Sequence, residues 1–335
     1  MSDNRQFVTP AILGLGIFLP RKVMTNQDLE QLVDTDNEWI ISRTGIRERR
    51  IASENETTAT LATEASIRAL GDAGMSPDDI DLIILATSSP DMPGYPSTAC
   101  LVQHALGLSG RFVPAFDLAA ACSGFGYGLN VASQFVRTGF YKHILVIGAE
   151  TNSRILDYTD RTTCILFGDG AGACIVGPTK GKHEIIDGYM AADGSGALML
   201  RIPAGGSKMP ASHNTVDEHL HSIKMEGRPV FKFAVNAMNG MIEDILKKHK
   251  LTPDDIGIVI PHQANFRITD AVSERTCIPK ERIYMNLDRY GNTSAASVPI
   301  AFREAIDEGK VPDGKYVIIA AFGGGLTKTS VLIKW

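Results

Sequence analysis

Met75-Ser-Pro-Asp-Asp-Ile-Asp-Leu-Ile-Ile-Leu85 recurs almost literally later in the chain as Leu251-Thr-Pro-Asp-Asp-Ile-Gly-Ile-Val-Ile-Pro261. Each copy follows a pattern of apolar residues with helical spacing, at Thr60–Ala73 and at Val235–Lys248. Each copy then enters a run of aliphatic residues after the Asp-Asp turn, which is typical of a buried strand. The repeat therefore predicts two similar helix–turn–strand units.

Two further pairs of segments occur in the same order. Tyr141–Gly148 resembles Lys315–Ala320, and Phe167-Gly-Asp-Gly170 resembles Phe322-Gly-Gly-Gly325, each glycine motif being followed by an apolar run. Three matches in one order argue against a coincidence between generic strand patterns. We conclude that the chain contains an internal duplication.

The duplication predicts an α/β protein of two halves, residues 1–178 and 179–335, in which strands alternate with helices. The Ile-, Val- and Leu-rich strands Leu82–Leu85 and Ile144–Ile147 suit central positions in a sheet that is covered on both faces. Packing of the halves about a pseudo-twofold axis would bring equivalent loops together at one crevice. Groups far apart in the sequence could then form one site.

The composition is that of an ordinary globular protein and excludes several functions. Hydrophobic residues make up 44% and charged residues 21% of 335 positions. A net charge of −5 argues against nucleic-acid binding, which needs a positive surface. No uninterrupted apolar run approaches the roughly 20 residues of a membrane span. The run Ala11–Leu19 contains two glycines and lacks a basic leader, so we expect the first strand there rather than a signal peptide.

Neither the cysteines nor the histidines form a metal motif. The five cysteines show no disulfide framework and no CxxC pair, which fits a reducing cytoplasm. His213, His219 and His221 fall in Gly194–His221, a segment rich in Gly, Ser and Pro, and no partner residue completes a ligand set. We expect a solvated loop there and no metal site.

Cys122 stands where a strand pattern gives way to a helical one. It lies in Phe116-Asp-Leu-Ala-Ala-Ala-Cys122-Ser-Gly, and the apolar spacing predicts a helix over Ser123–Arg137. The free N–H groups of a helix start favour a thiolate, and the small neighbours leave room for a substrate. The alternative is a buried cysteine that acts as a small hydrophobic residue.

Two polar signatures in the second half also lie at strand ends. Pro261-His-Gln-Ala-Asn265 closes the expected strand Ile256–Ile260, and Arg289-Tyr-Gly-Asn-Thr-Ser294 precedes an expected helix over Ala296–Glu308. Ligands of open α/β sheets bind beyond the carboxyl ends of the strands. A lone histidine there is more often a packing residue and a lone Gly-Asn more often a turn, so these signatures gain their value from the combination with Cys122.

The ordered motifs carry a resemblance over nearly the whole chain, from Leu13 to Trp335. The chain resembles the thiolase-fold condensing enzymes, and most closely the 3-oxoacyl-[acyl-carrier-protein] synthase III family. The motifs that carry the resemblance are Asp36–Arg49, Ala119-Ala-Ala-Cys122-Ser-Gly, Phe167-Gly-Asp-Gly-Ala-Gly, Pro261–Asn265, Gly291-Asn-Thr-Ser-Ala-Ala-Ser and Ala321-Phe-Gly-Gly-Gly325. The resemblance implies a five-layer αβαβα fold of two thiolase-like halves, the first carrying the nucleophilic cysteine and the second the histidine and asparagine.

The resemblance also implies a catalytic set of Cys122, His262 and Asn292. A cysteine thiolate takes an acyl group from a thioester and keeps it reactive. Decarboxylation of a malonyl thioester generates an enolate, and an imidazole and an amide can donate hydrogen bonds to its oxygen without the repulsion that a carboxylate would cause. The backbone N–H groups of Cys122 and Gly324 are the implied oxyanion donors.

The remaining implied sites concern the substrates. They are coenzyme A binding by Thr35, Trp39, Arg43 and Arg161, an acyl pocket at Tyr95, Leu166 and Phe167, and carrier-protein docking at Lys232 and Arg267. The bulky Tyr95, which reaches across a dimer interface in the family, predicts a short primer such as acetyl. The implied reaction joins this acyl-CoA primer to malonyl-acyl carrier protein and starts fatty acid synthesis in the cytoplasm. The implied assembly is a homodimer that needs no cofactor, because coenzyme A enters as part of the substrate.

Several alternatives remain open. A secondary-metabolism synthase of polyketide or quinolone type would share Cys-His-Asn but use another primer or acceptor. A thiolase would need a second cysteine where this chain has Gly323–Gly325, and a hydroxymethylglutaryl-type synthase would need a catalytic glutamate in a matching motif. A papain-like hydrolase would place its cysteine near the mature N-terminus, and a carrier-binding scaffold would need no catalysis. The chain departs from the family pattern at Arg228-Pro229, Leu108–Val113 and Leu326–Ser330, which leaves primer and acceptor open.

Overall fold

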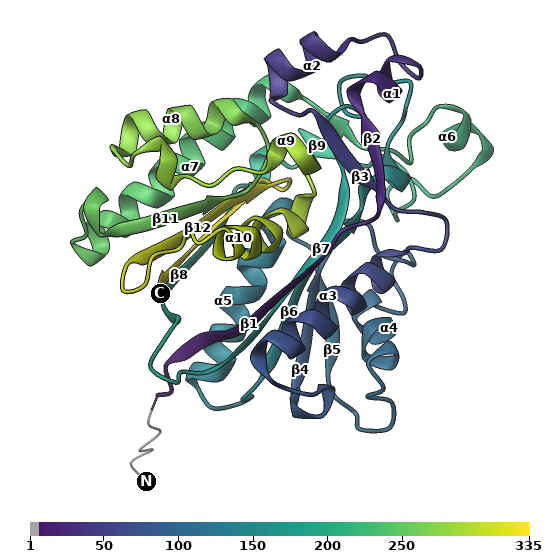
Figure 1. Cartoon of the computed structure of the whole chain (residues 1–335). Helices are drawn as coiled ribbons and strands as arrows, with labels where there is room; N and C mark the ends of the chain where they lie inside the picture. Colours follow the sequence, from purple (N-terminus) through teal and green to yellow (C-terminus); the bar gives the residue numbers. More distant parts are fainter. Residues whose placement is uncertain (1–6) are drawn as a thin grey trace.

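The computed structural model describes residues 7–335, whose principal strands form one nine-stranded mixed sheet (Figure 1). The strand order is β11-β12-β13-β8-β1-β7-β6-β4-β5. These strands are β1 (Pro10–Phe18), β4 (Leu82–Ala86), β5 (Ala115–Leu118), β6 (Ile144–Thr151), β7 (Asp169–Pro178), β8 (Glu184–Ala192), β11 (Ile256–Pro261), β12 (Tyr316–Gly323) and β13 (Thr327–Lys334).

The same order of parallel and antiparallel strand pairs occurs in both halves of the sheet. On one side β1 runs antiparallel to β7, β7 antiparallel to β6, and β6 and β5 parallel to β4. On the other side β8 runs antiparallel to β13, β13 antiparallel to β12, and β12 parallel to β11. In this second set, the position that corresponds to β5 is occupied by Ile283, which forms an isolated parallel bridge with Val259 of β11. The two sets meet where Ala11 of β1 pairs with Glu184 of β8, which confirms two similar halves.

The duplicated segments form β4 and β11, and the same turn precedes each. These turns are the short 3₁₀ helices η1 (Pro77–Asp79) and η5 (Pro253–Asp255). In η1 the carboxylate of Asp79 accepts from the backbone N–H of Ser76 at 2.9 Å, and Asp255 accepts from Thr252 at 2.7 Å. Proline presets the backbone at the first position of such a turn, and the carboxylate satisfies an N–H that has no helical partner.

The two sets of strands form two β layers, and helices lie outside each set and between them, which gives the five-layer αβαβα arrangement (Figure 1). The outer layers hold α3 (Thr58–Ala73) with α4 (Thr98–Ala105), and α7 (Gly227–His249) with α8 (Phe266–Thr276), while α5 (Gly124–Arg137) and α10 (Ser297–Asp307) lie between the halves. Alternation along β4 shows how one strand serves two layers, because Leu82 and Ile84 join the central core and Ile83 and Leu85 join the core under α3 and α4.

The remaining elements lie around this framework. They are β2 (Lys22–Thr25), α1 (Asn26–Glu30), α2 (Asn37–Thr44), β3 (Glu48–Ile51), η2 (Ala121–Ser123), η3 (Asn152–Ile155), η4 (Gly194–Gly196), β9 (Leu200–Arg201), α6 (His213–Asp217), β10 (Lys224–Met225), η6 (Lys280–Arg282), α9 (Leu287–Tyr290) and η7 (Ser294–Ala296). The expected irregular segment 194–221 thus holds only short elements.

The helices predicted over 60–73, 123–137 and 296–308 are confirmed to within two residues at each end. The helix predicted to begin at Val235 begins instead at Gly227, so its predicted start is wrong. Pro229 falls in the first turn of α7, where the missing N–H costs no hydrogen bond, so the helix extends through it. Among residues 7–335, no helix combines the length and the apolar character that crossing a bilayer requires.

Candidate active site

Cys122 lies in the 3₁₀ turn η2, between the end of β5 and the start of α5. The Cys122 residue is only 5% exposed, and the preceding residue, Ala121, has a positive φ of 47°. Small neighbours are needed for this close approach, because a Cβ on Gly124 would lie 2.7 Å from the Cβ of Ala86. The prediction that the cysteine stands between a strand and a helix is confirmed.

Burial and hydrogen bonding have opposite effects on the pKa of the Cys122 thiol. Burial raises its pKa to about 12, hydrogen bonding from Ser294 opposes that rise, and the nearby Glu150 carboxyl adds to it. The Sγ donates to the Ser294 Oγ at 3.5 Å. Burial thus opposes the effect that was predicted for the helix start, which favours the thiolate, and that effect stays a prediction.

His262 follows β11 and is held from two sides. Its backbone N–H donates to the carbonyl of Ala320 at 2.9 Å, and its Nδ1 lies 2.7 Å from the Ser297 Oγ. The ring stands edge-on to Phe322 with centroids 5.3 Å apart. Burial lowers the pKa of His262 to about 3, so the imidazole is neutral, and its Nε2 is buried without a hydrogen-bond partner among residues 7–335. In the tautomer in which Nδ1 accepts from the Ser297 hydroxyl, the ring proton is on Nε2, which can then donate.

Asn292 is fixed by hydrogen bonds of its backbone and of its side-chain oxygen, Oδ1. Its N–H donates to Leu166 at 2.8 Å, its carbonyl accepts from Gly168 at 3.0 Å, and its Oδ1 accepts from the N–H of Ser294 at 2.8 Å. The amide NH₂ is thereby left for other partners, and hydrogen bonding from Asn292 lowers the pKa of Cys122. Asn292 and Cys122 therefore share one site.

One short segment brings the three residues together. Asn292 precedes η7, whose Ser294 contacts Cys122, and the next residue after η7, Ser297, holds His262. The predicted Cys-His-Asn set thus converges on η7 and the start of α10.

The glycine-rich turn after β12 lies against the cysteine loop. A Cβ on Gly323 would lie 2.7 Å from the backbone nitrogen of Cys122 and 3.0 Å from the carbonyl of Ala120, so no larger residue fits. The Thr327 Oγ1 also donates to Ala120 at 3.0 Å. Gly324, the next residue, is therefore held beside the Cys122 peptide. Gly168 is packed as closely, because its Cβ would lie 2.3 Å from the Tyr290 carbonyl.

The residues expected to bind coenzyme A gather on and beside α2. The guanidinium carbons of Arg161 and Arg43 lie 5.3 Å and 5.8 Å from the centre of the Trp39 ring. The Thr35 Oγ1 is buried without a partner among the described residues. An indole ring with guanidinium groups close to it is a surface on which a planar base can stack.

Of the two residues expected at the docking surface, Arg267 lies beside this cluster. Its Nη2 donates to the carbonyl of Ser42 at 3.0 Å, and Asn265 donates to the carbonyl of Arg43 at 2.9 Å. The start of α8 is thereby tied to α2. Lys232 is exposed near the start of α7, which packs on α8.

The residues expected to form the acyl pocket are divided. Phe167 is 4% exposed and forms a parallel bridge with Asn292, and Leu166 accepts from Asn292, so both lie at the site. Tyr95 is 88% exposed in the loop between β4 and α4. Within one chain the structure does not bring Tyr95 to the cysteine.

Sequence reasoning missed three residues of the site, Glu150, Ser294 and Ser297. Both serines lie in the Gly-Asn motif, of which only the asparagine was expected to act. Glu150 is fully buried at the end of β6, and it accepts from Ser88, Ser89 and Ala295. A lone acidic residue at the end of an otherwise apolar strand, Ile144–Thr151, was the available signal.

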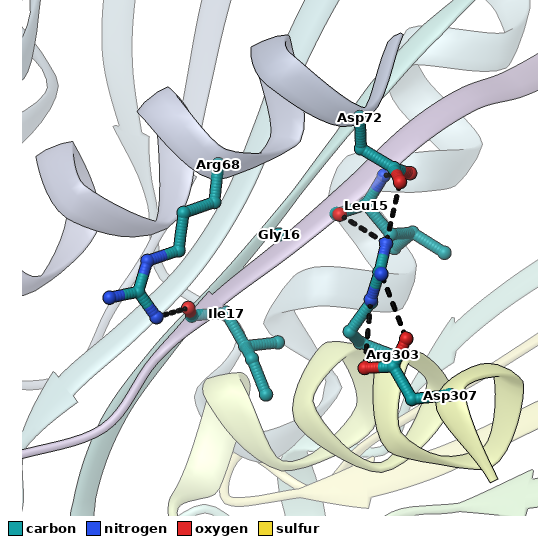
Figure 2. A pocket seen from close by; sticks show the side chains of 7 residues that line it. All are labelled: Leu15, Gly16, Ile17, Arg68, Asp72, Arg303 and Asp307. Carbon is teal, nitrogen blue, oxygen red and sulfur yellow. Dashed lines mark hydrogen bonds and ion pairs between the residues drawn. The ribbon is translucent and has the colours of Figure 1, made fainter.

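A separate hollow of about 360 Å³ lies between β1, α3 and α10, and none of the residues predicted to be catalytic lines it (Figure 2). Its Arg303 donates to Asp72 at 2.7 Å and to the carbonyl of Leu15 at 3.1 Å, and pairs with Asp307 at 2.8 Å. Arg68 donates to the carbonyl of Ile17 at 2.8 Å. Both guanidinium groups thus form hydrogen bonds or ion pairs within the protein. We interpret the hollow as a place where an ion pair links α3 to α10.

Two of the three histidines that raised the question of metal binding have other partners. The His219 Nδ1 lies 3.2 Å from Asp157, and the His221 Nε2 lies 3.0 Å from the Thr215 hydroxyl. In the part of the chain that the structure describes, no three His, Cys, Asp or Glu side chains are grouped so that they could hold a metal ion.

Comparison with known proteins places this geometry in a family. The profile of 3-Oxoacyl-[acyl-carrier-protein (ACP)] synthase III matches residues 116–201, and that of its C-terminal part matches residues 246–335. The Beta-ketoacyl-[acyl-carrier-protein] synthase III of Caldanaerobacter subterraneus subsp. tengcongensis is 53% identical over 98% of this chain and 98% of its own length. That of Clostridioides difficile is 50% identical over 97% and 98%.

Solved structures of proteins from two organisms or pathways resemble this chain over almost its full length. The 3-oxoacyl-[acyl-carrier-protein] synthase III of Aquifex aeolicus is 48% identical and superposes with a TM-score of 0.88 over 97% of this chain and 100% of that chain. The priming β-ketosynthase of the R1128 polyketide pathway is 33% identical, with a TM-score of 0.89 over 98% and 97%. Full-length identity near 50%, two matching family profiles and a shared thiolase-like fold lead to one conclusion: this chain belongs to the 3-oxoacyl-[acyl-carrier-protein] synthase III family.

Proposed function

We propose that the protein joins a short acyl-CoA primer to malonyl-acyl carrier protein in a decarboxylating Claisen condensation, which gives a 3-oxoacyl-acyl carrier protein and starts fatty acid synthesis. The observation that carries the proposal is the convergence of Cys122, His262 and Asn292 on η7 and the start of α10. The names of the relatives, which share about half of their residues with this chain over almost its full length, support it.

The first step transfers the acyl group. The sulfur of Cys122 attacks the thioester carbonyl carbon as its thiol loses a proton, and the bond to the coenzyme A sulfur breaks. The departing coenzyme A thiolate takes up a proton, and an acyl-cysteine remains. Oxyanion stabilisation is assigned to the backbone N–H groups of Cys122 and Gly324, which the close packing of Gly323 on the cysteine loop supports. Loss of one such donor typically costs about 10²–10³ in rate.

The second step generates the nucleophile. Malonyl-acyl carrier protein loses carbon dioxide, and the enolate oxygen accepts hydrogen bonds from His262 Nε2 and the Asn292 amide. The neutral state of His262 suits a donor that does not transfer its proton, and both donors have their other atoms already occupied. The carbanion then attacks the acyl carbonyl carbon, and the bond to the Cys122 sulfur breaks. No cofactor is needed, because the thioesters supply the activation.

Substrate binding is assigned to two surfaces. The adenine of coenzyme A stacks on Trp39 beside Arg161 and Arg43, with Thr35 as a further contact. Lys232 and Arg267 meet the carrier protein, since an acidic enzyme needs a local basic patch for an acidic partner.

We also propose a homodimer formed along β5, with acetyl as the primer. The edge strand β5 carries Phe116, which is 38% exposed, and the nearby loop carries Tyr95 at 88% and Met92 at 45%. An exposed strand edge with apolar side chains is a surface that a second copy would cover. Tyr95 would then reach the partner's acyl pocket and leave room for a short chain only. The five free cysteines support a reducing, cytoplasmic location.

The test is a primer comparison. Purified protein is given acetyl-CoA or octanoyl-CoA with malonyl-acyl carrier protein, and the products are separated by mass. We expect 3-oxobutyryl-acyl carrier protein from acetyl-CoA. A clear preference for octanoyl-CoA would contradict the proposal that acetyl is the primer. A polyketide role is the second candidate, because the R1128 priming enzyme is 33% identical, and transfer to a polyketide carrier protein only would favour it.

A further inference from the structure

The glycine-rich turn between β12 and β13 carries one of the two proposed oxyanion donors, the N–H of Gly324. The pairing of Gly323 with Thr327 closes this hairpin, so the turn itself is Gly324-Gly325-Leu326. Two successive glycines leave the backbone of a turn with few conformational restrictions. The turn therefore keeps a donor in a fixed place only where neighbouring groups hold it.

Backbone hydrogen bonds hold the turn on the side away from the cysteine. The N–H of Leu326 donates to the carbonyl of Asp193 at 2.9 Å, and the N–H of Asp193 donates to the carbonyl of Leu326 at 2.8 Å. Asp193 directly follows β8, which does not carry Cys122. These two bonds therefore do not by themselves set the distance between Gly324 and the cysteine loop.

The side chain of Thr327 links the turn to the cysteine loop. Its Oγ1 donates to the carbonyl of Ala120 at 3.0 Å and lies 3.2 Å from the carbonyl oxygen of Gly324. The same Ala120 carbonyl accepts the N–H of Ser123 at 3.1 Å and so closes the turn η2, which contains Cys122. One hydroxyl thus contacts the residue that carries the donor and the carbonyl that closes the cysteine turn.

The two turns lie close together, and their N–H groups are available. A Cβ on Gly323 would lie 2.7 Å from the Cys122 nitrogen and 3.0 Å from the Ser123 nitrogen. The N–H of Gly324 donates to no backbone carbonyl among residues 7–335. The N–H of Cys122 belongs to the first turn of a helix, where such groups have no helical partner. Both N–H groups can therefore serve an oxygen of the substrate.

From these contacts we infer that Thr327 is a positioning residue of the oxyanion hole. Its hydroxyl holds the N–H of Gly324 at the distance from the N–H of Cys122 at which both can donate to one oxygen atom. The inference rests on the proposed function, since it concerns acyl transfer at Cys122. Thr327 acts through Gly324 and Ala120 rather than on the substrate.

This role predicts which steps depend on the threonine. A tetrahedral oxyanion forms at the acyl carbonyl carbon during acylation of Cys122 and again during carbon–carbon bond formation. The enolate of the decarboxylation step is assigned to other donors, His262 and Asn292. Loss of the Thr327 hydroxyl should therefore slow acylation and leave decarboxylation unchanged, whereas a general loss of structure would slow both.

The experiment compares Thr327→Val, which removes the hydroxyl and keeps the shape, with Thr327→Ser, which keeps the hydroxyl. Thr329→Val is the matched control on the same strand, because Thr329 is fully buried and its Oγ1 donates to another carbonyl, that of Tyr189, at 2.9 Å. Acylation of Cys122 is followed by rapid-quench mass spectrometry at several concentrations of acetyl-CoA. Decarboxylation of malonyl-acyl carrier protein is measured by carbon dioxide release, and urea unfolding gives the stability of each variant.

We expect Thr327→Val to lower the maximal acylation rate about 10- to 10²-fold, because a displaced oxyanion donor loses part of its usual contribution of about 10²–10³. The acetyl-CoA concentration that gives half of this rate should change less than about twofold, and decarboxylation less than about threefold. Thr327→Ser should become acylated within about threefold of the wild-type rate. Thr329→Val should be less stable than wild type and keep both rates.

Acylation of Thr327→Val within about threefold of wild type would overturn the inference, as would a parallel loss of acylation and decarboxylation. An equal loss of acylation in Thr327→Ser or in Thr329→Val would overturn it too. If Thr327→Val does not fold, Thr327→Ala removes the same hydroxyl at this half-buried position, and the same outcomes decide. Failure of the wild type itself to become acylated would instead overturn the proposed function.

Discussion

His262 Nδ1 lies 2.7 Å from the Oγ of Ser297, the first residue of α10. A helix that packs in the central layer therefore fixes the imidazole ring. The other ring nitrogen is left buried without a partner among the described residues, which is costly unless a ligand uses it. The unpaired nitrogen is the property that a hydrogen-bond donor to an enolate needs.

Removal of either side chain that we propose donates a hydrogen bond to the enolate should affect decarboxylation but not acylation. We expect His262→Ala and Asn292→Ala each to lower malonyl decarboxylation by at least about 10²-fold, since one oxyanion donor contributes about that much. Acylation of Cys122 by acetyl-CoA should persist in both variants. Decarboxylation is measured by carbon dioxide release and acylation by intact mass. Loss of acylation with decarboxylation preserved would refute the assigned roles.

Trp39 should contribute to binding and not to chemistry. We expect Trp39→Ala to raise the KM for acetyl-CoA about tenfold while kcat stays within twofold, because stacking on an aromatic ring is worth about 1–3 kcal/mol per base. Trp39→Phe should recover part of the loss. S-acetyl-pantetheine, which lacks the adenine, is the control substrate, and its KM should be equal in wild type and Trp39→Ala. An equal rise for both thioesters would contradict the clamp.

The buried His262 also predicts how stability depends on pH. Its pKa is near 6.5 in the unfolded chain and near 3 in the fold, so between these values the unfolded state binds one more proton. The free energy of unfolding should fall as the pH falls from 6.5 to 5, by about 1.4 kcal/mol per unit from this group. Urea unfolding of wild type and His262→Gln should show that difference in slope. Equal slopes would show that His262 is accessible to protons in the fold.

Arg49 should be a large contributor to stability although it lies outside the catalytic set. It is fully buried, burial lowers its pKa to about 10, and it donates to Asn26 Oδ1 at 2.9 Å and to the carbonyls of Ile165 at 2.8 Å and Met24 at 3.3 Å. Arg49→Ala leaves a cavity and three unpaired acceptors, so we expect a loss of about 3–5 kcal/mol in the free energy of unfolding.

The control for this prediction is Arg111→Ala, which removes an exposed ion pair with Asp78. Exposed pairs contribute about 0–1 kcal/mol. Chemical denaturation of both variants gives the comparison. A similar small loss in the two variants would show that the buried arginine is replaceable.

Much of the fold was predictable because local signals agreed with global ones. The Pro-Asp-Asp turns before β4 and β11 carry their own capping carboxylates, Asp79 and Asp255, and the apolar runs after them form buried strands. The start of α7 was not predictable in this way, because Pro229 normally marks a boundary and here occupies the first turn. The exact division of the chain after residue 178 stays a prediction.

The residues that meet at the site could be predicted from the sequence, but the ionisation of their side chains could not. Short motifs identified Cys122, His262 and Asn292, but the ionisation of the thiol depends on burial depth, which three elements distant in the sequence create together. The contact from Ser294 to Cys122 joins residues 172 positions apart, and no local pattern encodes it.

The most direct test of the proposed reaction is a pulse and chase on the cysteine itself. The protein is incubated with acetyl-CoA, the acylated peptide is identified by tandem mass spectrometry, and malonyl-acyl carrier protein is then added. We predict an acetyl group on Cys122 that disappears as 3-oxobutyryl-acyl carrier protein forms, and neither event in Cys122→Ser. Product formed at an undiminished rate by Cys122→Ser, or an acetyl group on Cys122 that malonyl-acyl carrier protein does not discharge, would contradict the assigned role of the cysteine.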